Sequence, residues 1–345
     1  MKKIVYLSIG ILAIFSACEN QEWEFPDFDY STVYFAYQSP VRTITLGEDI
    51  YDNTLDNLHR CRIMATMGGV YENTKNIVID VAVNNSLCDS LGMVNASGDT
   101  TVGLAMPSDY YTLPAEMQIM IPSGEMMGGI EVQLTDAFFA DPLAILNTFV
   151  IPLVMTSVSN ADSILSGSTE LDNPDRLVAA DWTTVPKDYV LYAIKYINPW
   201  HGFYLRRGID NVTGNSGNTA LDTTHIYHEK YVEWDEVCQA ATLSMNEVIL
   251  YLTTKEVGNI TVPFEVVATF DENNNCTLSN SDTASYSLSG NGEFVDNGDM
   301  WGDEERDVLH LDYTIDFGTT THSVTDTLVM RNRGVNFETF TPVVL

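Results

Sequence analysis

Alternating hydrophobic and polar residues run through most of the chain and predict an all-β protein. Segments with a two-residue period, rich in β-branched and aromatic residues, are bounded by Gly, Pro, Asn and Asp, which is typical of strands. In the first half of the chain they are 31–37, 42–46, 60–67, 76–83, 117–121, 129–134 and 149–156. Asp141 followed by Pro142 predicts the start of one short helix.

Residues 157–187 interrupt this alternation and predict a domain boundary. The strand pattern then resumes at 188–197, 202–209, 224–234, 247–253, 262–270, 285–290, 306–317 and 322–333. Strands at this spacing with short polar turns favour antiparallel sandwiches or barrels over α/β folds. We therefore expect an Ig-like antiparallel β-sandwich with one short helix at 31–170, a linker at 171–187, and a lipocalin-like antiparallel barrel or sandwich at 188–345.

The N-terminus has the parts of a secretory signal: Lys2 and Lys3, an apolar run, and small residues before Cys18. The run from 4 to 15 is shorter than the ~20 apolar residues that a membrane-spanning helix needs. Cys18 after Ser and Ala resembles the lipobox of bacterial lipoproteins, although Phe15 stands where Leu is usual. The sequence predicts a signal peptide at 1–17, lipid attachment at Cys18 and a tether at 18–30; the alternative is a plain secretory signal.

The acidic residues restrict the classes of partner. The formal net charge of −32 repels phosphates, so we expect no nucleic-acid partner and membrane contact through the lipid anchor alone. The other cysteines form no C-x-x-C pair, which excludes zinc ribbons and thioredoxin-like redox sites. A bridge between Cys61 and Cys88 and free buried thiols both remain consistent with an exported chain.

Several segments together resemble a known pair of domains. The segments 43–57, 67–88, 110–124 and 132–167 resemble the N-terminal β-sandwich domain, of uncharacterised function, of surface lipoproteins from gut Bacteroidota. The segments 200–208, 301–313 and 326–340 resemble a barrel-like C-terminal domain that is often fused to it. The resemblance implies an outer-membrane lipoprotein that faces the outside and handles polysaccharide, beside Sus-type transport components. It supplies no binding residues.

Sugar recognition needs flat aromatic faces and side chains that bond hydroxyl groups. Trp200 and Trp301 each lie in a polar, Gly-containing turn, where exposed rings and binding loops are expected. With Tyr204 they are the candidate ligand-binding residues; the alternative is a Trp that closes the end of a barrel.

No motif in the chain predicts catalysis or a metal. His225 and His228 are three residues apart on an expected strand, whereas zincins need a helical spacing of four. The loop from Asp271 lacks the Gly and Glu of a calcium loop, so only adventitious calcium is expected there or at 294–305. We expect no catalytic residue, no metal site and no cofactor. The predicted function is non-catalytic polysaccharide binding; the alternatives are a glycan hydrolase or lyase of unrecognised type, or a structural or adhesin protein.

Overall fold

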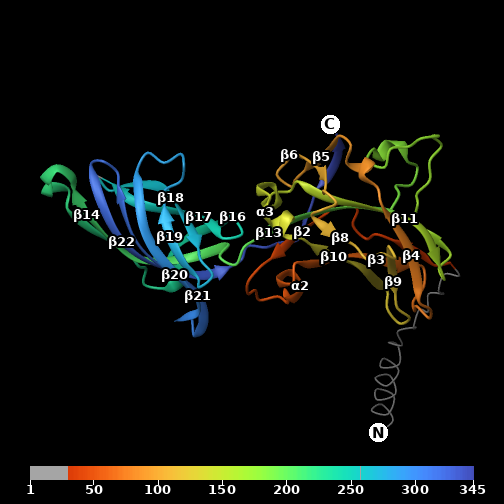
Figure 1. Ribbon diagram of the computed structural model, residues 1–345, viewed down its shortest axis with the longest axis horizontal. Coiled ribbons are helices and arrows are strands. Elements are labelled where there is room, and N and C mark those ends of the chain that lie inside the picture. The colour runs from red at the N-terminus through yellow and green to blue at the C-terminus, as the bar shows by residue number, and fades with distance from the viewer. Residues whose placement is uncertain (1–29, 257) are drawn as a thin grey trace, which may run out of the picture.

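The computed structural model describes residues 30–256 and 258–345, which form two β-rich domains joined end to end (Figure 1). The N-terminal domain is a layered β-sandwich, and the C-terminal domain is a closed β-barrel. The all-β prediction is therefore confirmed. Of the two alternatives for the second domain, barrel or sandwich, the structure shows the barrel. The signal peptide, Cys18 and nearly all of the expected tether lie outside the described residues.

The first layer of the sandwich is a five-stranded sheet in the order β12–β1–β3–β10–β8. Side chains of Cys61, Ile63 and Ala65 alternate with exposed neighbours along one strand, and this face is buried in the main core. The strands are β1 (Thr32–Tyr34), β3 (Arg60–Gly68), β8 (Tyr111–Thr112), β10 (Met127–Leu134) and β12 (Ser163–Ile164).

The central layer is covered on both faces. Its order is β23–β2–β13–β11–β4–β9, with β7 beside β11. Tyr192 and Ile194 pack against the first sheet, whereas Tyr189 and Leu191 pack into a second core on the other face, so this strand is apolar throughout. The strands are β2 (Pro40–Thr45), β4 (Ile77–Val83), β7 (Leu104–Ala105), β9 (Gln118–Ile121), β11 (Phe149–Ser159), β13 (Tyr189–Ile197) and β23 (Glu338–Thr339).

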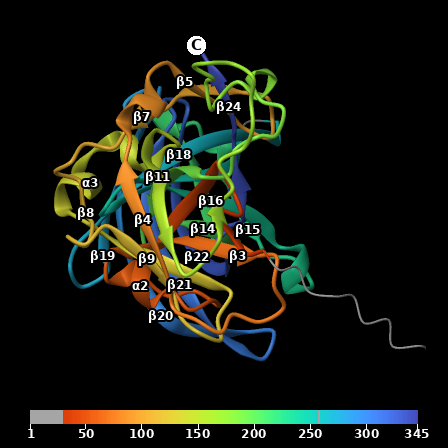
Figure 2. The same ribbon diagram turned by 90° about the vertical axis from the view of Figure 1, so that its right-hand side faces the viewer.

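A third layer and short helices complete the sandwich. The layer contains β5 (Leu91–Val94), β6 (Thr100–Val102) and β24 (Thr341–Val344), with β24 beside β5 (Figure 2). The predicted helix is a 3₁₀ turn at Pro142–Ile145, where the Asp141 carboxylate accepts from the Leu143 amide at 2.8 Å. Two α-helices, α2 (Thr54–Asn57) and α3 (Asp136–Ala140), were not predicted. Every helix among the described residues is too short or too polar to span a bilayer.

The barrel is an eight-stranded antiparallel sheet that closes where β14 pairs with β22. An additional strand, β15, pairs with the distal half of β14. The strands are β14 (Gly202–Gly214), β15 (Thr223–Tyr227), β16 (Glu236–Ser244), β17 (Glu247–Glu256), β18 (Ile260–Phe270), β19 (Asn275–Ser279), β20 (Ser287–Trp301), β21 (Glu304–Asp316) and β22 (Thr320–Asn332).

The structure divides the chain differently from the sequence prediction. Strand β13 was assigned to the second domain, but it pairs with β11 and β2 in the sandwich. After β22 the chain returns to the sandwich as β23 and β24, so the barrel is an insertion between two sandwich segments. The pairing of β13 with β2, like that of β1 with β12 and β11 with β7, is parallel rather than antiparallel. Pairings between distant segments leave no local signal in the sequence.

Candidate functional site

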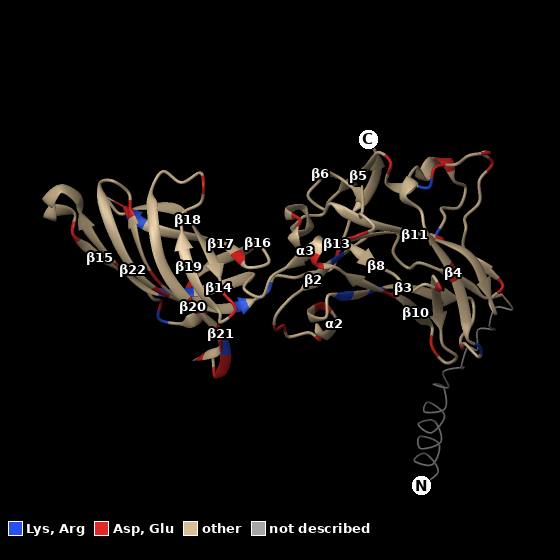
Figure 3. Ribbon diagram, viewed as in Figure 1, with Lys and Arg blue, Asp and Glu red and all other residues tan. Residues whose placement is uncertain are grey.

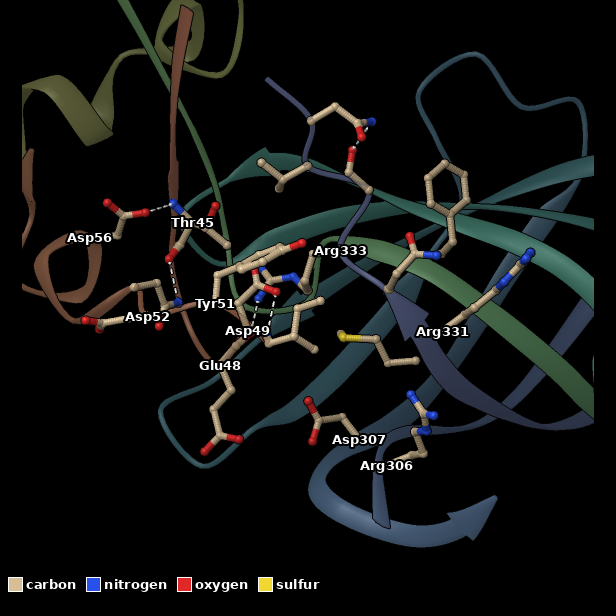
Figure 4. Close-up of a pocket in the computed structure, with 18 of the residues that line it drawn as sticks. Thr45, Glu48, Asp49, Tyr51, Asp52, Asp56, Arg306, Asp307, Arg331 and Arg333 are labelled. Carbon is tan, nitrogen blue, oxygen red and sulfur yellow. Dashed lines mark hydrogen bonds between the residues drawn. The ribbon is translucent and has the colours of Figure 1, made fainter. Parts of the chain in front are cut away.

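A hollow of about 1140 Å³ lies between the two domains (Figure 4). We call it the interdomain cleft. One wall is the loop between β2 and α2, and the other is the part of the β20–β21 hairpin next to its turn, with the end of β22. Its polar lining residues are Arg42, Thr45, Glu48, Asp49, Asp52, Asn53, Asp56, Asn297, Glu305, Arg306, Asp307, Arg331, Asn332, Arg333 and Asn336.

The sandwich wall is held by side-chain amides. Asn53 donates to the carbonyl oxygens of Thr45 and Gly47 at 3.0 and 2.7 Å. Asn57 accepts from the Gly47 amide at 2.8 Å and donates to its carbonyl at 2.9 Å. Gly47 has a φ of +85°, and a Cβ there would lie 2.8 Å from a carbon of Pro199 in the interdomain crossover. This glycine therefore permits both the turn and the close approach of the two segments.

A buried ion pair supports the same wall from behind. Asp56 is almost fully buried and accepts from the Thr45 amide at 2.9 Å and from the Arg42 guanidinium. Burial raises the pKa of Asp56, and the hydrogen bond from Thr45 and the charge of Arg42 oppose that rise. Because both carboxylate oxygens are occupied, Asp56 holds the loop and is not free to meet a ligand.

Arg333 joins the two domains at the floor of the cleft. Its guanidinium donates to the carbonyls of Glu48 and Leu46 in the sandwich loop, at 2.6 and 2.9 Å. It also donates to the carbonyls of Asn198 and His201 in the crossover, both at 2.7 Å. The side chain is 5% exposed, and burial lowers its pKa. Five fixed donors suit this role better than the point charge of a lysine would.

The barrel wall of the cleft carries the accessible cation. Arg331 is exposed and forms no ion pair within the described part of the chain. Arg306, in contrast, pairs with Glu304 at 2.5 Å, and Asp307 accepts from the Asn297 amide at 2.9 Å. Figure 4 shows Asp307 on the barrel wall, across the cleft from Glu48 on the sandwich wall. Arg331 is therefore an exposed lining arginine whose donors are not taken up by an ion pair among the described residues, and in Figure 4 its side chain lies on the barrel side and extends away from Asp49 and Tyr51.

The cleft is suited to hydrogen bonding along an extended polar ligand. Its carboxylates accept, its guanidinium groups donate, and its asparagine amides do both, which matches the mixed character of sugar hydroxyls. Tyr51, 73% exposed at the tip of the sandwich wall, adds an aromatic ring. No motif in the sequence singles out this loop, because its side chains converge with the barrel wall only in the folded chain.

Two of the predicted ligand-binding residues are buried in the barrel. Trp200 is 7% exposed and stacks on Phe270, with ring centroids 3.9 Å apart and an interplanar angle of 5°. Tyr204 is fully buried, and its hydroxyl donates to the Trp200 carbonyl at 2.7 Å. Both belong to the apolar core of the barrel. The predicted sugar contacts at these residues were therefore wrong, because the turn points its ring inward to close the barrel.

Trp301 lies at the surface, as expected, but outside the cleft lining. It precedes the tip of the β20–β21 hairpin, where Gly302 and Asp303 both have positive φ. One face of its ring covers the Arg207 guanidinium at 4.5 Å, and Arg207 in turn binds Asp235 at 2.7 Å. Sugar contact at Trp301 remains a prediction.

The structure also shows the state of the four described cysteines and of possible metal ligands. Cys61, Cys88, Cys238 and Cys276 are all free and buried, so the structure has no Cys61–Cys88 bridge. Burial raises the pKa of each thiol to about 12. Within residues 30–256 and 258–345, no three His, Cys, Asp or Glu side chains form a group that could hold a metal.

Comparison with known proteins shows which family the chain belongs to. A crystal structure of a Bacteroides ovatus protein of unknown function shares 43% sequence identity with it. The match covers 92% of this chain and 100% of that one, with a TM-score of 0.84. The chain belongs to the family of that protein. Within this family, the barrel at 199–334 matches the domain of unknown function DUF5627, and residues 28–162 match the model of an N-terminal domain.

A more distant likeness and one negative result complete the comparison. A multidomain Bacteroides ovatus protein that includes DUF1735 is 13% identical, with 89% of this chain and 97% of that one covered and a TM-score of 0.41. No curated protein matches the sequence.

Proposed function

We propose that this protein is a lipid-anchored, non-catalytic surface protein that binds polysaccharide in the interdomain cleft. The observation that carries the proposal is the convergence of hydroxyl-bonding side chains from both domains on one open space of about 1140 Å³. Arg331 supplies donors that are free of other partners among the described residues, and Tyr51 supplies an exposed ring for stacking.

The charge of the chain favours this class of ligand over other polymers. A net charge of −32 repels nucleic acids and anionic lipids, and Asp and Glu are spread over both domains (Figure 3). A neutral polysaccharide meets no such repulsion, and its hydroxyls bond carboxylates, amides and guanidinium groups alike.

The proposed anchor and partners rest on the N-terminal sequence. Cys18 follows an apolar run and two small residues, and acylation there would hold the domains at the outer membrane. A surface protein that captures polysaccharide would act beside Sus-type transport components. Replacing Cys18 by Ala is expected to move the protein from the membrane fraction to the soluble fraction. Membrane retention of Cys18→Ala would refute the anchor without affecting the cleft.

Affinity electrophoresis on a panel of plant and host glycans tests binding. The wild-type protein is expected to be retarded by at least one glycan. Arg331→Ala should weaken that retardation roughly tenfold, because a hydrogen bond to a charged group contributes about 1.5–3 kcal/mol. Arg60→Ala, at an arginine outside the cleft whose side chain is 42% exposed, is the control and should leave it unchanged.

The same panel separates the alternatives. Absence of retardation on every glycan would overturn the proposal and favour a structural or adhesin role. Appearance of new reducing ends would instead identify a hydrolase, and reducing ends with unsaturated products a lyase. Equal loss of retardation in Arg331→Ala and Arg60→Ala would place the binding site elsewhere on the protein.

A further inference from the structure

A second hollow, of about 570 Å³, adjoins the interdomain cleft and has the opposite character. We call it the apolar pocket. It lies between Tyr37, Met64, Met127, Tyr192 and Phe337, and it shares Arg42, Tyr51, Val335 and Asn336 with the cleft. One ligand can therefore occupy both spaces.

The pocket exists because β3 loses a neighbour. Strand β1 pairs with β3 only from Thr66 to Gly68, and no described strand pairs with this edge of β3 from Arg60 to Ala65. After β1 the chain crosses to the central sheet, where the Phe35 amide donates to the Lys187 carbonyl at 2.9 Å. Tyr192 lines the resulting gap between the sheets but is only 9% exposed, and its hydroxyl donates to the Arg62 carbonyl at 3.3 Å.

The walls of the pocket are flat and apolar. The rings of Tyr37 and Phe337 lie 5.0 Å apart at 57°, and these side chains are 58% and 69% exposed. Met64 and Met127 are 39% and 48% exposed. Thioethers adapt their shape to aromatic partners and make favourable sulfur–ring contacts. A contiguous exposed apolar surface on so acidic a protein marks a binding site rather than ordinary surface.

The rim of the pocket carries two guanidinium groups. Arg62 is 56% exposed and lies 3.9 Å from Glu131, a separation that leaves its donors available. Arg42 is held by Asp56 and is 36% exposed. Guanidinium groups stack on aromatic rings and donate to carbonyl oxygens, so this rim suits the junction between an aromatic group and a polar chain.

We propose that the apolar pocket takes an aryl substituent of a saccharide whose sugar units lie in the interdomain cleft. This inference rests on the proposed polysaccharide binding. An aryl ring fits the apolar pocket better than a sugar does, because the walls offer ring faces and thioethers while hydroxyl-bonding groups line the cleft.

Calorimetric titration with matched glycosides tests the proposal. The probes are p-nitrophenyl and methyl β-glycosides of xylo-, gluco-, galacto- and manno-oligosaccharides, with p-nitrophenol alone as a further probe. At least one aryl glycoside is expected to bind about tenfold tighter than its methyl counterpart. Phe337→Ser and Met64→Glu, both at exposed positions, should abolish this difference. Trp234→Ser, at a similarly exposed aromatic residue of the barrel, should preserve it.

The outcomes distinguish the two proposals. Equal, measurable affinity for the aryl and methyl members of every pair would overturn the aryl pocket and leave polysaccharide binding in place. Binding of p-nitrophenol as tight as that of the best aryl glycoside would overturn the shared occupancy, because the sugar would contribute nothing. Absence of binding to all probes would overturn the aryl pocket, and the glycan panel would then decide the proposed function separately.

Discussion

The interiors of the two domains differ in the polarity of their buried side chains. The cores of the sandwich are apolar, and its buried carboxylates Asp56 and Asp188 lie at the margins, paired with arginines that are 30–36% exposed. In the distal half of the barrel, charged groups fill the centre: Arg206, Asp210, His322 and Asp326 are each at most 1% exposed.

This difference changes how each domain is stabilised. Apolar burial is spread over many contacts, and the loss of one contact removes a small part of the total. A buried charge depends on its few partners, and removing one partner leaves an uncompensated charge in a medium of low polarity. The sandwich should therefore tolerate changes to its ion pairs that the barrel does not.

Removing Asp326 tests this contrast with the largest expected effect. Its carboxylate binds the Arg206 guanidinium at 2.9–3.0 Å and accepts from the Tyr313 hydroxyl at 2.7 Å. Asp326→Ala is expected to lower the free energy of unfolding by about 3–5 kcal/mol, because Arg206 stays buried without its main counter-ion. Urea unfolding followed by tryptophan fluorescence measures it, since Trp200, Trp234 and Trp301 lie in the barrel.

The control for this prediction is the sandwich pair. Asp188→Ala frees Arg176, which is 30% exposed and can be solvated, so a smaller loss is expected there by circular dichroism. The double change Arg206→Met with Asp326→Leu should recover most of the stability lost in Asp326→Ala, because it removes both buried charges. Equal losses in Asp326→Ala and Asp188→Ala would contradict the contrast between the domains.

The sequence pattern predicted strands that pack on an apolar core better than segments whose structure depends on polar side-chain contacts. Strands β3 and β4 lie within one residue of the predicted segments 60–67 and 76–83, because one face of each packs on the core. The expected strand at 224–234 ends at Tyr227, where the Asp235 carboxylate accepts from the Glu229 amide at 2.9 Å and closes a turn. The local alternation of hydrophobic and polar residues does not indicate such a side-chain contact.

The charged interior and the candidate site needed three-dimensional information. Arg206 and Arg207 are neighbours in sequence, yet one is fully buried and the other covers Trp301 at the surface. Which of them points inward depends on strand register. Asp210 and His322 meet at 2.9 Å across 112 residues of sequence. The cleft likewise joins a sandwich loop to a barrel hairpin, so only the chemistry of each half was available from the sequence.

His322 gives the barrel a pH dependence that the apolar cores lack. Its Nδ1 lies 2.9 Å from Asp210 and its Nε2 lies 3.1 Å from Glu256. Burial alone would lower the pKa of His322, but the hydrogen bond and charge of Asp210, followed by those of Glu256, outweigh it and raise the pKa. The imidazolium thus stabilises the fold fully below the unfolded value of about 6.5, and this contribution is lost as pH rises through the folded pKa.

His322→Gln should therefore be most damaging at acidic pH. The expected loss is about 1.5–3 kcal/mol near pH 6, the contribution of hydrogen bonds to a charged group. The difference from the wild type should shrink as pH rises through the raised folded pKa, above which the histidine is neutral in both states. Leu153→Ala in the sandwich core is the control, with a loss that stays constant across this range. A difference for His322→Gln that grows with pH would refute the imidazolium.

Trp301 brings the comparison to the surface, where the smallest effect is expected. Its ring lies over Arg207, which keeps its ion pair with the buried carboxylate of Asp235 whether or not the ring is present. An exposed cation–π contact contributes about 0.5–1 kcal/mol, so Trp301→Ala should lower the free energy of unfolding by no more than that in urea. Asp235→Ala, which removes the buried partner of the same arginine and the acceptor for the Glu229 amide, should cost more. If Trp301→Ala instead destabilised the barrel as strongly as Asp326→Ala, the hairpin would be part of the core, and the division between a charge-dependent interior and a dispensable exterior would fail.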